Sequence, residues 1–444
     1  MKKFIIMKNL PHVIWLFLLV FSNGIAQQEK GIVGTNNWLN NWTEFKPYQV
    51  DYGEATQILT GNIKIDTKLY KRNVYMLLGS VFVTNGATLT IEPGTVIIGD
   101  YDSKASLTIC RGATIIADGL ETDPIVFTSN RSVKKAGDWG GLFILGDAPT
   151  NKFGNGSAAS FHSNLSTTDY INTTYGGTKP FSNSGILRYV RIEYAGKKVN
   201  GVGNYNALFL GGVGYKTELE NIMVSFSGGN AFNVLGGEVN LNKLISYKSN
   251  GNDFEFNFGT KCNIFNSLAV RSAYVSSNNG ARCINVRSYD KKEEVDFTKK
   301  GSDVKAIYLT LFNNSADLMS NIEMGLIKEA VFIGEDTSFE MNKSVISGFN
   351  PAVILEEKIK INNENLEKIK FYEMYFNNSN GNIFSEYNAD NEDLENWYGN
   401  SAFYNVYSKG SDSETFINST SDKKPDYRLR INKIMASQTL VQKN

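Results

Sequence analysis

"LTIEPGTVIIGD", residues 89–100, is followed closely by "LTICRGATIIAD", residues 107–118. Leucine, threonine, isoleucine, glycine and the final aspartate recur at the same places in the two copies. Short β-branched runs bounded by glycine, proline or aspartate are typical of strands joined by tight turns. The repetition therefore predicts strands that stack in register, with Leu89 directly beside Leu107.

A second repeat lies in the middle of the chain. Its copies are "LENIMVSFSGGNAFNVLGG", residues 219–237, and "LNKLISYKSNGNDFEFNFG", residues 241–259. Helical hairpin repeats need more than about 30 residues, so the units of both repeats are too short for them. Units of two or three strands cannot bury an apolar face alone, whereas stacking them about 4.8 Å apart buries one continuous core.

The two repeats predict an all-β, right-handed parallel β-helix (a solenoid) with coils of about 18–22 residues. We expect this β-helix to span residues 60–355, after an N-terminal cap or segment at 27–59. Residues 356–444 are predicted to hold the last coils, a cap and a polar tail. The glycine-, serine- and asparagine-rich residues 151–184 are predicted to form a long lateral loop, and such loops are where solenoids usually bind. A β-sandwich, the competing fold, does not require matching residues at a fixed spacing.

The N-terminus has the pattern of a targeting segment. "MKKFIIMK" supplies positive charge, residues 13–21 form a short apolar run, and small residues precede Gln27. This pattern predicts a secretory signal peptide over residues 1–26. The apolar run is too short to span a bilayer comfortably, so we expect no transmembrane segment after cleavage. The protein is expected to be exported to the cell surface, the outer membrane or the medium, with the periplasm as an alternative.

The charge balance and the histidine content exclude several classes of function. Lysine plus arginine and aspartate plus glutamate both number 45, so the chain lacks the basic excess of a nucleic-acid-binding protein. Of the two histidines, His12 leaves with the signal peptide and His162 lies in a polar segment typical of a solvated loop. A multi-histidine metal site is therefore excluded, and a histidine-based catalytic triad is disfavoured. We expect no metal and no cofactor.

Four motifs in order carry a resemblance to a known family: "GATLTIEPGTVIIGD", "LTICRGATIIADGLETDPIVFTSN", "GDWGGLFILGDAPTN" and "SGILRYVRIEYAG". Between Thr60 and Leu355 the chain resembles secreted right-handed β-helix proteins of Gram-negative bacteria that use type IX secretion. Most are hypothetical cell-surface proteins, often encoded beside TonB-dependent receptors, and no catalytic residues are established for them. The resemblance implies a non-enzymatic protein that binds an outer-membrane protein or a surface glycan, such as an accessory subunit of a receptor or transport complex.

Aromatic residues in the irregular segments are the candidate contacts for such a partner. Trp139 lies between glycines in "GDWGG", where an exposed ring could stack on a sugar; closure of the core at a coil edge is its alternative role. Four tyrosines in or near the long loops complete the candidate set: Tyr170, Tyr175, Tyr205 and Tyr215.

The alternative function is that of a polysaccharide lyase or glycoside hydrolase. Such enzymes need two carboxylates, or a carboxylate with arginine or lysine, converging in a lateral groove. Asp253 and Glu255 alternate with phenylalanines, which predicts a strand with the acids pointing outward but no catalytic constellation. Glu193 is also expected to point outward from a strand, and Asp138 is expected to form a turn.

The cysteines offer a candidate cross-link. The spacing between Cys262 and Cys283 is close to the repeat length. That spacing predicts equivalent positions on adjacent coils, with Cα atoms about 5 Å apart, within disulfide range. A disulfide and a pair of stacked buried thiols both remain open, and Cys110 is expected to be a lone thiol.

Overall fold

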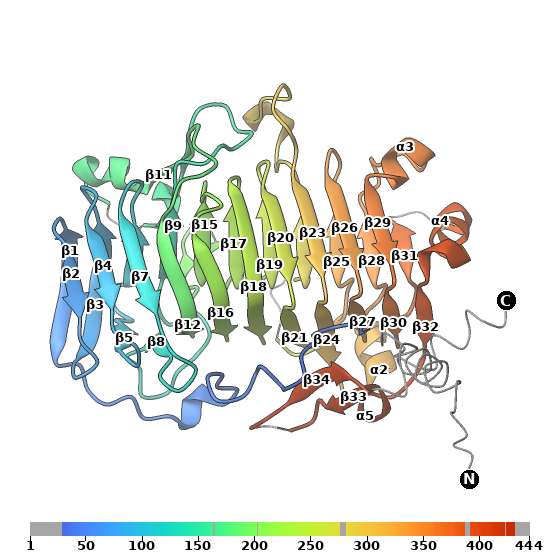
Figure 1. The fold of residues 1–444 in the computed structure, drawn as a ribbon, viewed down its shortest axis with the longest axis horizontal. Helices are drawn as coiled ribbons and strands as arrows, with labels where there is room; N and C mark the ends of the chain where they lie inside the picture. The colour runs from blue at the N-terminus through green and yellow to red at the C-terminus, as the bar shows by residue number, and fades with distance from the viewer. Residues whose placement is uncertain are drawn as a thin grey trace, which may run out of the picture.

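The computed structural model describes residues 29–430, apart from residues 163–164, 202, 276–280, 387–390 and 422. The predicted signal peptide lies outside the described residues. Figure 1 shows one elongated stack in which short strands wind from the N-terminal coils to the C-terminal coils. These strands pair in parallel within one 28-stranded sheet, so the predicted all-β, right-handed parallel β-helix is confirmed.

Each coil contributes one segment to each of three parallel faces, which we call sheets 1, 2 and 3. Sheet 1 stacks β2 (Thr67–Leu69), β4 (Thr88–Ile91), β7 (Thr114–Asp118), the first halves of β12 (Gly185–Glu193), β16 (Glu218–Ser225) and β18 (Glu238–Tyr247), and then β20 (Lys261–Phe265), β23 (Asp303–Ile307), β26 (Ser338–Asn342) and β29 (Ile369–Tyr372).

Sheet 2 follows sheet 1 in every coil. It stacks the first halves of β1 (Gln57–Ile63) and β3 (Val74–Val83), β5 (Val96–Gly99), β8 (Ile125–Ser129), the second halves of β12, β16 and β18, and then β21 (Leu268–Ser272), β24 (Thr310–Asn314), β27 (Val345–Ser347), β30 (Tyr375–Asn377) and β32 (Val406–Ser408). The three long strands turn from sheet 1 into sheet 2 at single residues with left-handed φ: Tyr189, Asn221 and Lys243.

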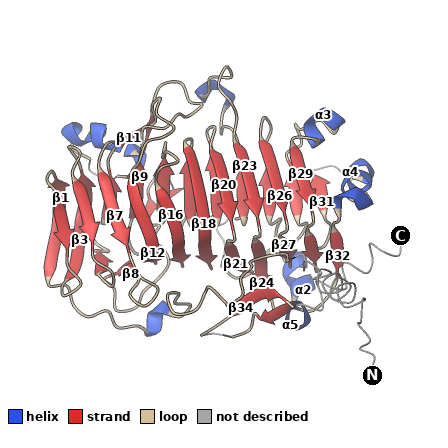
Figure 2. Cartoon of the chain, viewed as in Figure 1, coloured by secondary structure: helices blue, strands red, loops and turns tan. Residues whose placement is uncertain are grey.

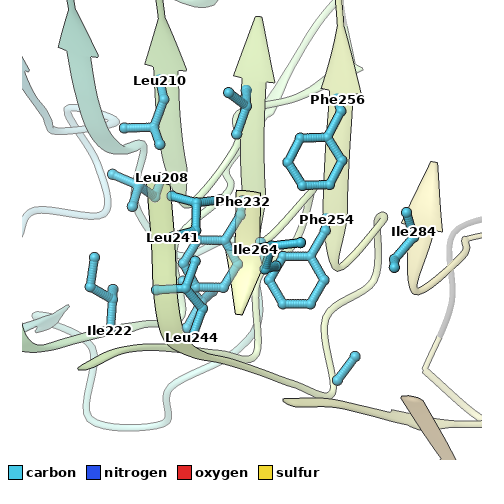
Figure 3. Packing of buried hydrophobic residues seen from close by; sticks show 14 of the residues in the cluster. Leu208, Leu210, Ile222, Phe232, Leu241, Leu244, Phe254, Phe256, Ile264 and Ile284 are labelled. Carbon is cyan, nitrogen blue, oxygen red and sulfur yellow. The ribbon is translucent and has the colours of Figure 1, made fainter. Parts of the chain in front are cut away.

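Sheet 3 completes each coil. It stacks the second halves of β1 and β3, β6 (Ser106–Ile109), β9 (Gly141–Leu145), β15 (Leu208–Gly211), β17 (Phe232–Leu235), β19 (Phe254–Asn257), β22 (Ile284–Val286), β25 (Val331–Ile333), β28 (Val353–Leu355) and β31 (Ile383–Ser385). Its inward residues form rows along the stack, as Figure 3 shows for Leu208, Phe232, Phe254 and Ile284. The rings of Phe232 and Phe254 stack with centroids 5.2 Å apart.

The remaining elements decorate the stack. Figure 2 shows that helices lie only at its periphery. They are α2 (Leu318–Glu323), α3 (Asn363–Leu366), α4 (Glu392–Tyr398), α5 (Asp412–Thr415) and the 3-10 helices η1 (Pro47–Gln49), η2 (Ala159–Phe161), η3 (Thr167–Thr173), η4 (Lys292–Glu294) and η5 (Ser401–Phe403). Three small antiparallel pairs join β10 (Gly156–Ser157) to β11 (Thr174–Tyr175), β13 (Lys198–Val199) to β14 (Gly203–Asn204), and β33 (Phe416–Asn418) to β34 (Asp426–Leu429). In the described part of the chain, no helix is long and apolar enough to cross a membrane.

The second sequence repeat, at 219–237 and 241–259, corresponds to one coil. Leu219 pairs with Leu241, and Phe232 pairs with Phe254, so equivalent positions of the two copies lie side by side. Other coils are longer because their turns are longer: Leu187 pairs in sheet 1 with Ala117, and the whole 148–177 segment lies between them in the chain. The predicted coil length of 18–22 residues therefore holds for some coils, such as those that pair Gln57 with Tyr75 and Leu219 with Leu241, and is exceeded in the others.

The first sequence repeat does not correspond to a coil, so the predicted stacking of Leu89 on Leu107 is wrong. Leu89 pairs with Ile115, whereas Leu107 pairs with Leu142. The first copy turns from sheet 1 into sheet 2, and the second turns from sheet 3 into sheet 1. What repeats is a strand–turn–strand corner, whose turn glycines, Gly94 and Gly112, have φ values of +78° and +85°.

Residues 29–56 do not cap the first coil but form a strap along the outer face of sheet 2 (Figure 1). The strap begins at the last coils, where the backbone N–H of Gly31 donates to Lys343 O at 2.8 Å. It ends beside the early coils, where the Tyr52 hydroxyl donates to Glu193 Oε1 at 2.8 Å. Its apolar side chains pack on outward residues of sheet 2 and on the β33–β34 hairpin; they are Ile32, Leu39, Trp42 and Phe45.

Candidate functional site

The outer face of sheet 3 carries one outward residue per coil at a shared in-register position, which we call the outer ladder. Its members are Asn62, Phe82, Thr108, Phe143, Phe209, Asn233, Glu255, Asn285, Phe332, Ile354 and Phe384. Strand alternation explains this arrangement, because the residues on either side of each member point into the core. Three consecutive members, Asn233, Glu255 and Asn285, form its polar part; aromatic residues precede them at Phe143 and Phe209, and the ladder becomes apolar again at Phe332.

The aromatic part of the outer ladder is covered by the 148–177 segment and the β13–β14 hairpin. Phe143 and Phe209 are fully buried and pack with Phe161 and Tyr205. Tyr175, predicted to contact a partner, is 3% exposed and lies edge-on to Phe209, with ring centroids 5.7 Å apart. This half of the face is therefore closed.

The other predicted contact residues separate into buried and exposed groups. Trp139 is fully buried. Its ring stacks on that of Phe127, with ring centroids 6.4 Å apart, and its Nε1 donates a hydrogen bond to Glu193 O at 2.8 Å. Tyr205 is 1% exposed, so Trp139, Tyr175 and Tyr205 cannot meet a partner. Tyr170, on η3, and Tyr215, in the turn between β15 and β16, are 54% and 44% exposed and stay candidates.

His162 is also buried rather than solvated. It is 5% exposed and lies beside Phe143, with ring centroids 5.1 Å apart. Burial lowers the pKa of its imidazole to about 4, so the ring is neutral at physiological pH. Its Nδ1 lies 3.2 Å from the Ser80 hydroxyl. His162 thus contributes to packing under the covering segment.

Glu255 lies at the centre of the polar part of the outer ladder. Its carboxylate accepts hydrogen bonds from Asn252 Nδ2 at 2.6 Å and from Asn285 Nδ2 at 2.9 and 2.8 Å. It points outward, as predicted, but is only 8% exposed. Burial raises its pKa to about 7, while the two amides and Arg287 oppose the shift and Asp290 adds to it. A carboxyl group with this pKa can give or take a proton at neutral pH.

Two arginines lie close to the polar part of the ladder, and the charge of one of them, Arg287, acts on the Glu255 carboxyl group. The guanidinium carbons of Arg282 and Arg287 lie 4.6 and 4.8 Å from the centroid of the Phe332 ring, the ladder member next to Asn285. Arg282 Nε also donates to Glu329 Oε1 at 2.5 Å. We call Asn252, Glu255, Arg282, Asn285 and Arg287 the polar centre.

The polar centre retains unused hydrogen-bonding groups. The buried atoms Asn285 Oδ1 and Arg287 Nε have no hydrogen-bond partner within the described residues. Buried polar atoms in folded proteins nearly always have a partner, so each exception calls for an explanation. Asn285 Oδ1 and Arg287 Nε are therefore the two buried groups of the polar centre for which the described residues supply no partner.

A cavity of about 560 Å³ lies at the turns from sheet 3 to sheet 1; its lining begins at Ser288, directly after Arg287 in the chain, and includes no residue of the polar centre. Tyr289 and Phe297 meet edge to face at its wall, with centroids 5.6 Å apart, and Lys300 and Lys360 also line it. Asn151 Oδ1, buried in the lining, has no hydrogen-bond partner among the described residues. The volume of the cavity is within the usual range of small-molecule sites. Its lining carries charges of both signs, because acidic residues line it together with the lysines: Asp296, Asp303, Glu335 and Asp336.

Two further acids proved structural. Asp253, predicted to point outward, is fully buried at the turn into sheet 3, where its carboxylate pairs with Arg271 Nη1 at 3.0 Å. Glu193, also predicted to point outward, is 1% exposed beneath the strap. In both cases a neighbouring segment supplies the partner that lets the charge be buried. The described residues hold no group of three or more histidine, cysteine, aspartate or glutamate side chains placed to bind a metal.

Residues 61–419 match the family model described as a pectate-lyase-like β-helix domain. The chain belongs to the pectate-lyase-like β-helix family. No curated protein and no solved structure is similar enough to this chain to be matched. The family match covers every strand of sheet 3 from β6 to β31 and the whole polar centre.

The cysteines of this pectate-lyase-like β-helix are all free buried thiols, so the disulfide alternative is wrong. Cys262 lies on β20 in sheet 1, in register with Val239 and Val304. Cys283 directly precedes β22 in sheet 3, where its carbonyl accepts from Phe254 N at 2.8 Å. The spacing between the two cysteines thus links two different sheets, and the thiols are not stacked either. Cys110 is a lone thiol, as predicted.

Sequence reasoning missed Arg282, Arg287, Asn233 and Asn285. A signal for the two asparagines was present in the triplets "FNV" at 232–234, "FEF" at 254–256 and "INV" at 284–286, which place a polar residue at one phase. Only the pairing of these three strands shows that the triplets form one ladder.

Proposed function

We propose that this protein is an exported polysaccharide lyase that acts on a glycan containing uronic acid. The observation that carries the proposal is the polar centre: an outward carboxyl group with a pKa of about 7, held by two amides, with the charge of Arg287 acting on it. A glycoside hydrolase would need a second carboxylate across the bond. Asp290, the acid whose charge acts on Glu255, already accepts a hydrogen bond from Asn257 Nδ2 at 2.8 Å, and Glu329 is engaged by Arg282.

In this mechanism Glu255 is the general base. The ionised carboxylate takes the proton from C5 of a uronate, and the C5 electron pair forms the C4–C5 double bond. The C4–O bond then breaks, and the leaving oxygen takes a proton from solvent. Arg287 neutralises the uronate carboxylate, which stabilises the carbanion-like transition state. Lys300 and Lys360, in the cavity at the turns from sheet 3 to sheet 1, would bind a neighbouring acidic residue of the glycan.

The test is turnover of polyuronates by the mature protein, followed by the ultraviolet absorbance of the unsaturated product. We expect Glu255→Gln to lower kcat by about 10²–10⁴-fold and to leave retention on a polyuronate affinity gel unchanged. Glu218→Gln, at an exposed acid of sheet 1, is the matched control and should retain full activity. The pH profile of the wild type should show an ionisation near pH 7. A wild type that binds polyuronates without cleaving them would overturn the enzyme proposal.

The second candidate is a non-enzymatic partner-binding role at the cell surface, including that of an accessory subunit beside a TonB-dependent receptor. The low exposure of Glu255, at 8%, and the exposed rings of Tyr170 and Tyr215 favour it. This second candidate also includes export of the protein through type IX secretion. Purification from the native outer membrane distinguishes the two, because co-purification with a barrel protein supports the second candidate and recovery as a lone soluble protein contradicts it.

A further inference from the structure

Arg282 and Arg287 share one aromatic ring but differ in their charge partners. Their guanidinium carbons lie 4.6 and 4.8 Å from the centroid of the Phe332 ring, which is only 2% exposed. Arg282 Nε is paired with Glu329 Oε1 at 2.5 Å, and both of these side chains are largely buried. Arg287 makes no ion pair within the described residues, and its buried Nε has no hydrogen-bond partner there. The charge of Arg282 is therefore compensated, whereas that of Arg287 is not.

The position of Arg287 is fixed from the coils on both sides. Its backbone N–H donates to Phe256 O in the preceding coil at 2.9 Å. In the following coil, the N–H of Gly334 donates to Val286 O at 2.8 Å. Gly334 is buried against the stem of Arg287, because a Cβ atom at this glycine would lie only 3.2 Å from Arg287 Cγ. Phe332 and Gly334 thus form a seat for Arg287, the first against its guanidinium and the second against its stem.

The charge of the seated Arg287 acts on Glu255. Burial raises the pKa of Glu255 to about 7, and Arg287 opposes this rise because it favours the ionised carboxylate. Asp290 acts in the opposite sense, while the amides of Asn252 and Asn285 donate hydrogen bonds to the carboxylate. Of these four groups only Arg287 carries a positive charge. Because the interaction of two charges depends on their distance, movement of Arg287 from its seat would change the ionisation of Glu255.

We propose that Phe332 and Gly334 are positioning residues that act on the polar centre through Arg287. By holding the guanidinium in place, they keep the carboxyl group of Glu255 ionised at a lower pH than burial alone would allow. Arg282, on the same ring, takes no part, because its charge is already compensated. The inference rests on the proposed function only for its catalytic consequence, namely that a general base is available at neutral pH. The ionisation of Glu255 itself can be measured without a substrate.

The test is the ionisation of Glu255, measured from the pH dependence of unfolding. The free energy of unfolding of each variant is compared with that of the same variant carrying Glu255→Gln, so the difference isolates this one group. The wild-type midpoint should lie near pH 7. Arg287→Gln and Phe332→Leu should each raise the midpoint by about one pH unit, because the ionised carboxylate loses the nearby positive charge. Gly334→Ala should raise it by less.

Two controls separate positioning from a general effect on packing. Phe332→Leu should not change the midpoint further once Arg287→Gln is present, because the ring acts through that guanidinium. Removal of the neighbouring ion pair, by Arg282→Gln together with Glu329→Gln, should leave the midpoint unchanged. An unchanged midpoint in Phe332→Leu, or additive effects of Phe332→Leu and Arg287→Gln, would overturn the proposal. A shift in the ion-pair variant as large as that in Phe332→Leu would overturn it as well.

Catalysis provides a second measurement, which tests the lyase proposal separately. With a polyuronate as substrate, activity should rise with pH as Glu255 ionises. Phe332→Leu should move this rise to higher pH by the same amount as the midpoint of the stability curve. A pH profile that stays in place while the stability midpoint moves would contradict Glu255 as the general base. Absence of polyuronate cleavage overturns the lyase proposal, whereas the stability midpoints alone decide whether Phe332 positions Arg287.

Discussion

The two halves of the outer ladder show how one backbone arrangement can serve packing or chemistry. Phe143 and Phe209 lie on strands that pair in the same parallel register as those of Glu255 and Asn285. Over the first pair, a long segment folds down and buries the aromatic groups beneath it. Over the second pair, a carboxyl group is left with a raised pKa, and neighbouring polar atoms are left without partners among the described residues.

The difference indicates where sequence can change without loss of the fold. Inward residues must match their neighbours on both sides, because the core is one continuous row. Outward residues need to fit only the segment that covers them. The covered half adds stability to the β-helix, and the polar half accepts a cost in stability that is typical of functional sites.

The largest expected effect comes from opening the covered half. Phe209→Ala removes a fully buried ring and should lower the free energy of unfolding by about 3–5 kcal/mol, measured by denaturant titration. Hydrogen exchange should rise in the 148–177 segment and remain unchanged around Glu255. Exchange that rises equally at both places would show that the two halves are not independent.

A smaller effect of opposite sign is expected from Glu255→Gln. The pKa of Glu255 is raised from 4.5 to about 7, so between those values the folded state holds a proton that the unfolded chain has lost. Wild-type stability should therefore fall as pH rises from 4.5 to 7, while the variant should not show this fall. Above pH 7 the variant should be more stable by about 1–3 kcal/mol. Equal stability of the two proteins at pH 8 would contradict the burial of a charge at this position.

The smallest effect is expected from Asn285→Leu. This change removes the donor of two hydrogen bonds to the Glu255 carboxylate. The ionised form of Glu255 is then less stabilised relative to the protonated form. The pKa of Glu255 should rise above 7 by about one unit, and the midpoint of the pH–stability curve should move with it. Asn233→Leu, at the neighbouring ladder position, serves as the control because the contacts of the Glu255 carboxylate do not include Asn233.

The sequence predicted the class of fold, but it predicted the structure of only one of the two repeats correctly. The correspondence between Leu219 and Leu241 reports a true coil. The correspondence between Leu89 and Leu107 reports two corners, because all three sheets bury the same kinds of side chain and a corner of one resembles a corner of another. Periodicity alone cannot tell these cases apart, since strand and turn lengths vary around the coil.

The candidate site was predictable only in part, for a related reason. The outward phase of Glu255 follows from its alternation with Phe254 and Phe256. Its burial and its pKa depend on Asn285 and Arg287, which come from the next coil after a long turn. Trp139 is buried for the same kind of reason, since Phe127 and the Glu193 carbonyl reach it from other strands.

The strap has a consequence for how the molecule unfolds. In a simple solenoid each repeat touches only its neighbours, so distant coils can melt separately. Here Lys30 donates to Met374 O and Tyr404 O in the last coils, while Tyr52 holds Glu193 in an early coil. The backbone between them crosses the intervening coils, so loss of either end weakens the hold on the other. Residues 29–56 thereby convert a one-dimensional array into a single cooperative unit, and thermal unfolding should occur in one transition.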